Sequence, residues 1–117
     1  NLYLPEFKAK GWGHELWLVN TEGYCGKILH YAAGKKMSYH YHKIKDESWY
    51  VLAGRVVVKY GLTDDLDDAR QVILETGECF YVPPGLRHQI MALTDADILE
   101  VSTSHFETDS YRIVKGD

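Results

Sequence analysis

Three histidines and one glutamate stand at spacings that suit a metal site. His40 and His42 are two residues apart, so on a β-strand both side chains point to the same face. Glu47 follows after a short polar loop, at the start of the next run of strand-forming residues. His88 comes three residues after a Pro-Pro-Gly turn, which fixes how the following strand begins. The pattern predicts that the four side chains converge on one ion.

Three imidazoles and one carboxylate suit a divalent transition metal, namely Zn, Mn, Fe, Ni, Co or Cu. Magnesium and calcium prefer more oxygen ligands. Four protein ligands leave positions open on a metal that takes six, and water or a substrate can bind there and react. We therefore expect one divalent transition metal as the cofactor.

The elements that position these residues are expected to be β-strands. No segment of helix length shows a 3.6-residue period, and short runs rich in Val, Ile, Tyr and Trp alternate with Gly, Asp and Pro. The 117 residues predict a single all-β domain, a sandwich or barrel. Ala53-Gly54 is expected to form a hairpin turn. We expect strands at 15–20, 24–32, 36–42, 47–53, 55–60, 71–74, 78–82, 87–93 and 97–104.

Two expected strands look buried on both faces, at 36–42 and at 47–53. In the second of them, Trp49 and Val51 point one way, and Tyr50 and Leu52 point the other. A strand exposed on one side should be polar there. We therefore expect a cover on the second face, either the N-terminal segment 1–13 or a second subunit in a homodimer.

The sequence resembles the cupin superfamily in two motifs. Gly34–Gly54 has a glycine, five residues, His-x-His, four residues, Glu, six residues and a glycine. Gly77–His88 has a glycine, five residues, Pro-x-Gly, two residues and a histidine. Ala92 stands where that motif often ends in asparagine. The resemblance implies a jelly-roll barrel, a double-stranded β-helix, with the metal held in its mouth by the four residues above.

Within that superfamily the chain is most similar to the cupin domain of type II phosphomannose isomerases. Trp12-Gly13, the Pro-Pro-Gly turn and the tail from Ile98 to Asp117 carry this resemblance. Glu100 and Arg112 fall where the tail of that family has its acidic residue and its arginine. His40 stands where that family usually has glutamine.

This resemblance implies a metal-dependent isomerase or epimerase of a sugar or sugar phosphate. A base moves a proton between neighbouring carbons through an enediol. Arg112 would bind an anionic group of the substrate or stabilise developing charge. Glu100 is either the base or a solvated carboxylate at a strand end. Lys36, Lys59 and Arg87 are either alternatives to Arg112 or surface charges.

Two other functions stay open. Three histidines and a glutamate on Fe(II) would serve a dioxygenase that cleaves a diketone or oxidises a thiol, and the strict His-x-His pattern favours this. A thiol oxygenase often has a cysteine near its metal, and Cys79 is the candidate. The third function is a non-catalytic barrel that binds a sugar or a small acid.

Composition excludes other classes. The net charge of −4 and the lack of a basic face exclude a nucleic-acid partner. No apolar run approaches the roughly 20 residues that span a membrane, and no signal-peptide pattern appears, so we expect a cytoplasmic protein. Cys25 and Cys79 are expected to be buried, reduced thiols. His14, His30 and His105 have no spacing that distinguishes them from exposed polar residues.

Overall fold

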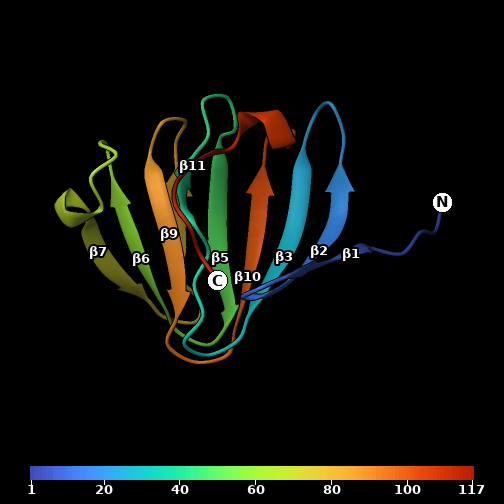
Figure 1. The fold of residues 1–117 in the computed structure, drawn as a ribbon. Coiled ribbons are helices and arrows are strands. Elements are labelled where there is room, and N and C mark those ends of the chain that lie inside the picture. The colour runs from blue at the N-terminus through green and yellow to red at the C-terminus, as the bar shows by residue number, and fades with distance from the viewer.

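The computed structural model describes residues 1–117 as two antiparallel β-sheets that face each other (Figure 1). The first sheet has the strand order β1-β2-β3-β10-β5-β8, and the second has the order β11-β4-β9-β6-β7. Two short 3-10 turns, η1 and η2, lie between strands. The bounds are β1 Glu6–Lys10, β2 Gly13–Asn20, β3 Cys25–Tyr31, β4 Tyr39–Tyr41, β5 Glu47–Ala53, β6 Val56–Gly61, η1 Leu66–Asp68, β7 Arg70–Leu74, β8 Cys79–Val82, β9 Arg87–Ala92, β10 Ala96–Ser102, η2 Glu107–Asp109 and β11 Tyr111–Val114.

The all-β prediction is confirmed, and each of the nine expected strands is present. The strands β1 and β11 were not expected. Both pair with a single neighbour at the edge of a sheet and contain no buried residue, so the alternating pattern is weak.

The predicted hairpin turn at Ala53-Gly54 is wrong. The turn connects β5 of the first sheet to β6 of the second, so the chain crosses between sheets at this point. Gly54 has a φ of +85°, and a Cβ there would collide with the carbonyl of Asp95. The crossing therefore needs glycine for both its conformation and its space.

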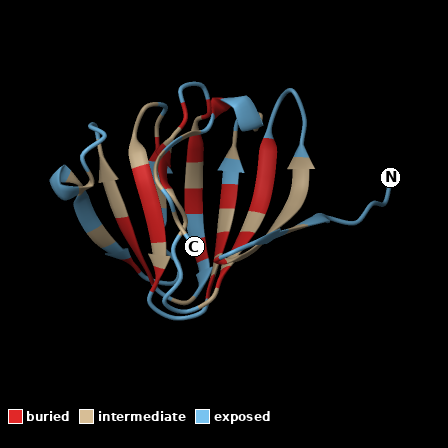
Figure 2. Cartoon of the chain, in the orientation of Figure 1, coloured by how far each residue is buried: buried red, intermediate tan, exposed pale blue.

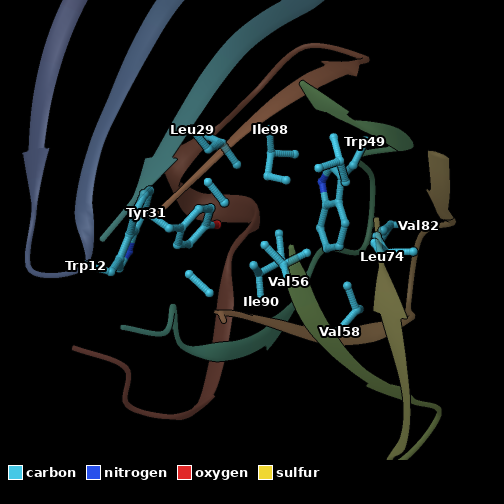
Figure 3. Close-up of a cluster of buried hydrophobic side chains, with 13 residues drawn as sticks. Trp12, Leu29, Tyr31, Trp49, Val56, Val58, Leu74, Val82, Ile90 and Ile98 are labelled. Atoms are coloured by element: carbon cyan, nitrogen blue, oxygen red, sulfur yellow. The ribbon is translucent and has the colours of Figure 1, made fainter. Parts of the chain in front are cut away.

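The hydrophobic core fills the space between the two sheets. Thirteen buried side chains form one cluster (Figure 3). Trp12 stacks on Tyr31 with ring centroids 4.3 Å apart. The buried residues are concentrated on β3, β5, β6, β9 and β10 (Figure 2). On the inner face of β9, His88 is two residues before the core residue Ile90, so the histidine continues the same inward row of side chains.

The second apolar face of β5 is open in the single chain. Tyr50 is 39% exposed and Leu52 is 42% exposed. The N-terminal segment does not cover them, because β1 lies at the far edge of the sheet and the first residues extend away from the barrel (Figure 1). A second subunit over this face stays a prediction.

Cys25 is buried and Cys79 is exposed, and both are free thiols. The expectation of burial is therefore wrong for Cys79, whose side chain lies on the outer face of β8, away from the histidines. The only helical elements are the two three-residue turns, and neither could span a membrane.

Candidate metal centre

The three predicted histidine ligands meet inside the barrel. His40 on β4 pairs directly with His88 on β9, and His42 follows the end of β4. Ligand atoms of the three rings all lie within 4.8 Å of one another, and all three residues are buried. The period-two spacing therefore places both early histidines on the inner face, as expected.

The outer nitrogen of each ring is fixed by a main-chain carbonyl. Because a carbonyl only accepts hydrogen bonds, each Nδ1 carries the proton and each Nε2 keeps a free lone pair. Hydrogen bonds of this kind orient ligating histidines in metal sites. The bonds run from His40 to Ser38 (2.9 Å), from His42 to Asp109 (2.9 Å) and from His88 to Leu86 (2.8 Å).

Glu47, the fourth predicted ligand, lies beside His42 at the start of β5 but is outside the group whose ligand atoms all lie within 4.8 Å of one another. Its Oε1 accepts a hydrogen bond of 2.6 Å from Trp49 Nε1, and its Oε2 lies 3.5 Å from His42 Nε2. Glu47 Oε2 and His88 Nε2 are both buried without a hydrogen-bond partner. Buried polar atoms without partners are costly, and atoms that point to a common centre fit a bound cation. The nitrogen and oxygen ligand atoms with free lone pairs fit a transition metal. The role of the four residues as ligands stays a prediction.

Burial keeps the three histidines in the form that binds metals. It lowers the pKa of His42 to about 4 and that of His88 to about 3, and it lowers the pKa of His40 well below its usual range. Desolvation penalises the charged imidazolium in each case. Near neutral pH all three rings are therefore neutral.

The metal-free protein is expected to lose stability as the pH falls from 6.5 toward 4. The unfolded histidines gain protons below about 6.5, whereas the buried ones stay neutral, so the unfolded state binds more protons and the free energy of unfolding falls. Urea unfolding of chelator-treated protein at a series of pH values measures this. His88→Gln should show a shallower decline. If the free energy of unfolding fell equally with pH in both proteins, this would contradict the lowered pKa of His88.

Metal binding near neutral pH is expected to release protons from Glu47. Burial and the nearby Glu100 carboxylate raise the pKa of Glu47 in the metal-free protein, so a cation must displace its proton. The histidines contribute none, because they are already neutral. Calorimetric titration in two buffers of different ionisation enthalpy counts the protons. Glu47→Gln should abolish the release, and an equal release from that variant would assign it to other groups.

Asp109 holds the loop between His42 and Glu47. Its carboxylate accepts main-chain N–H bonds from Lys43 (2.9 Å), Ile44 (3.1 Å) and Lys45 (2.9 Å). The turn η2, which ends at Asp109, lies beside this loop at one end of the barrel (Figure 1). The sequence offers no local signal for this residue, because its partners are more than 60 positions away.

A cavity of about 200 Å³ opens beside the histidines. Polar and charged side chains form most of its wall, and the predicted catalytic residues Arg112 and Glu100 both contribute. Arg112 lies opposite His40 in the register of β11 and β4, is exposed, and has no carboxylate partner. Glu100 is buried, and its Oε2 lies 2.6 Å from Lys45 Nζ. The interpretation of Glu100 as a solvated carboxylate is therefore wrong.

The alternatives to Arg112 lie elsewhere. Arg87 pairs with Asp64 at 2.9 Å. Lys36 and Lys59 line a separate small pocket.

Sequence reasoning missed several residues of the cavity wall. His105 was expected to be exposed, which is wrong, since its ring lies 3.2 Å from Lys45 Nζ and 3.2 Å from Glu107. Lys27 also lines the cavity. It alternates with Cys25 and Leu29 on an inward face, so strand parity was a signal that could have found it.

These features define a β-barrel with a cluster of inward histidines beside a polar cavity. Residues 27–103 match the family model of the cupin domain. Because the match spans more than half of the sequence, the chain belongs to the cupin family. No curated protein matched the sequence.

Solved structures share this fold at low sequence identity. The capsular polysaccharide assembling protein CapF from Staphylococcus aureus is 19% identical with a TM-score of 0.83, over 97% of this chain and 32% of that chain. Oxalate decarboxylase from Bacillus subtilis is 20% identical with a TM-score of 0.81, over 93% of this chain and 30% of that chain. The chain thus spans about a third of the length of these proteins.

Proposed function

We propose that this cupin is a metal-dependent isomerase or epimerase of a small sugar or sugar phosphate. One observation carries the proposal: three of the four candidate ligands, His40, His42 and Glu47, line a cavity. The wall of this cavity also holds a buried carboxylate, Glu100, and an unpaired guanidinium, Arg112. A base and an anion-binding group beside a metal are the groups that a proton shift next to a carbonyl requires.

Glu100 is suited to the role of the base. Burial alone would raise its pKa, but Lys45 and Lys27 outweigh this and lower the pKa, so the carboxylate stays ionised. It would remove a proton from the carbon beside a carbonyl and return it to the carbonyl carbon, while the hydroxyl proton moves to the former carbonyl oxygen. A bound divalent metal would supply Lewis-acid polarisation of the substrate oxygens. Arg112 would bind an anionic group of the substrate at the mouth of the cavity.

Two resemblances support a sugar as the substrate. The motifs and tail of the sequence resemble the cupin domain of type II phosphomannose isomerases. The fold is shared with a capsular polysaccharide assembling protein. The fold is equally shared with oxalate decarboxylase, whose name indicates a small acid, so the substrate needs a direct test.

The test is proton exchange in D2O. Metal-loaded protein is incubated without air with pentoses, hexoses and their phosphates, and NMR follows the hydrogen on the carbon next to the carbonyl. We expect loss of that signal and formation of the isomer or epimer. Glu100→Gln should slow the exchange by at least about 100-fold, the usual contribution of a positioned base, while keeping bound metal. Exchange at the unaltered rate would exclude Glu100 as the base.

Oxygen uptake distinguishes the second candidate. The three-histidine and glutamate set also fits Fe(II), so a dioxygenase is expected to require iron and to consume oxygen with a diketone or thiol. The exposed, outward position of Cys79 gives no support to a thiol oxygenase. Saturable ligand binding with neither exchange nor oxygen uptake would indicate a binding protein.

A further inference from the structure

Lys27 is a buried cation in the cavity wall, and the proposed function gives it no contact with the substrate. Its side chain is 3% exposed, and its Nζ lies 3.8 Å from Glu15 Oε1 and 4.1 Å from the centre of the Trp17 ring. No acceptor lies within hydrogen-bond distance of this ammonium group. Because this ammonium group lines the cavity and donates no hydrogen bond within the chain, it is suited to a ligand that accepts hydrogen bonds.

Two carboxylates flank this ammonium group on the same wall. Glu15 Oε1 accepts a bond of 2.8 Å from Trp17, and Glu100 Oε2 accepts one of 2.6 Å from Lys45. The second oxygen of each carboxylate has no hydrogen bond within the chain. Lys27 on β3 is directly opposite Glu100 on β10, and Glu15 is on the adjacent strand β2. The wall therefore presents one donor group between two free acceptors.

This arrangement complements two neighbouring hydroxyl groups. A hydroxyl both donates and accepts, so each one can accept from Lys27 and donate to one carboxylate. The charges already balance within the wall, since Glu15 and Glu100 are matched by Lys27 and Lys45. A phosphate here would meet two carboxylates, whereas Arg112 on the opposite sheet has none.

We propose that Glu15, Lys27 and Glu100 form a subsite for the vicinal diol of a sugar, and that this end of the substrate is uncharged. The proposal rests on the proposed function, because it concerns the same cavity. The volume of about 200 Å³ lies below the roughly 300 Å³ at which sites for drug-sized ligands begin. The ligand is therefore a single small sugar whose anionic group, where present, lies at Arg112.

The first test compares deoxy sugars. Binding of D-mannose to zinc-loaded protein is measured by calorimetry or saturation-transfer NMR, beside its 2-, 3-, 4- and 6-deoxy analogues. We expect analogues that lack either of two adjacent ring hydroxyls to bind at least about tenfold more weakly, because each loses a hydrogen bond to a charged group. Equal affinity for mannose and all the analogues, or no binding of mannose at millimolar concentrations, would overturn the subsite.

The second test uses matched lysines. Lys27→Met removes the ammonium group and keeps the apolar stem, so mannose affinity should fall at least about tenfold. Lys8→Met is the control, because Lys8 also lies over the Trp17 ring, at 4.5 Å, but is outside the cavity. The Lys8→Met variant should bind mannose with unchanged affinity. If circular dichroism shows that Lys27→Met does not fold, Glu15→Gln replaces it as the test variant. Glu15→Gln turns the free acceptor into a donor, so mannose affinity should fall by a similar factor.

The two proposals fail in different ways. Mannose binding that depends on Lys27, without exchange or isomerisation of any sugar, would overturn the isomerase function and leave the subsite in place. Sugar turnover with unaltered substrate affinity in both Lys27→Met and Glu15→Gln would overturn the subsite and leave the isomerase function in place.

Discussion

His42→Ala is expected to lower the affinity for a divalent transition metal by more than about 100-fold. Loss of a residue that only orients a ligand typically costs 10- to 100-fold, and removal of a ligand should cost more. His42 has a free Nε2 directed at Glu47 Oε2, 3.5 Å away, and its ring is held by the carbonyl of Asp109. Competition with a chromophoric chelator at pH 7.5 measures the affinity.

His30→Ala is the matched control for that experiment. His30 lies on the outer face of β3, where its Nδ1 contacts Asp97 at 2.7 Å, so its loss should leave metal affinity unchanged. The same weakening in both variants would mean that His42 acts through general destabilisation. Full metal retention by His42→Ala would remove His42 from the site.

Lys45→Met is expected to destabilise the fold by about 3–5 kcal/mol, the usual cost of removing one partner of a buried ion pair. Its ammonium group is 2.6 Å from Glu100 and 4.0 Å from Glu47, and all three side chains are almost fully buried. Without Lys45, the Glu100 carboxylate loses its closest positive partner. Urea unfolding of the chelator-treated protein measures the difference.

Two comparisons make the Lys45 result specific. Adding Glu100→Gln to Lys45→Met should recover part of the lost stability, because no buried charge is then left without its partner. Arg55→Met breaks the half-exposed pair with Glu75 and should cost less than about 1 kcal/mol. A loss from Lys45→Met as small as that from Arg55→Met would contradict a strong buried pair.

Residue spacing predicted the part of the molecule that depends on strand periodicity and turn chemistry. The His-x-His pair, the Pro-Pro-Gly turn and nine strands could be read locally, since alternation alone decides which side chains share a face. The strands β1 and β11 could not, because neither has a buried residue to give a clear alternating pattern. The equally short edge strands β7 and β8, which were predicted, bury Leu74 and Val82.

Tertiary contacts decided the rest. Asp109 positions a loop more than 60 residues away, and His105 contacts Lys45, which is 60 residues away in the sequence. The turn at Gly54 has local hairpin chemistry, but the chain there changes sheets, which only the pairing of β5 with β10 and β8 reveals. Lys27 was readable from strand parity, yet its charge argued for the surface.

Elemental analysis tests the central claim most directly. The protein is purified without added metal or chelator, stripped, and reloaded at pH 7.5 with one divalent transition metal at a time, and the metal content is measured at each stage. The geometry of His40, His42, Glu47 and His88 predicts that one equivalent of metal is retained per chain after reloading. A chain that contains no metal as purified and takes up none of the six metals would contradict the account.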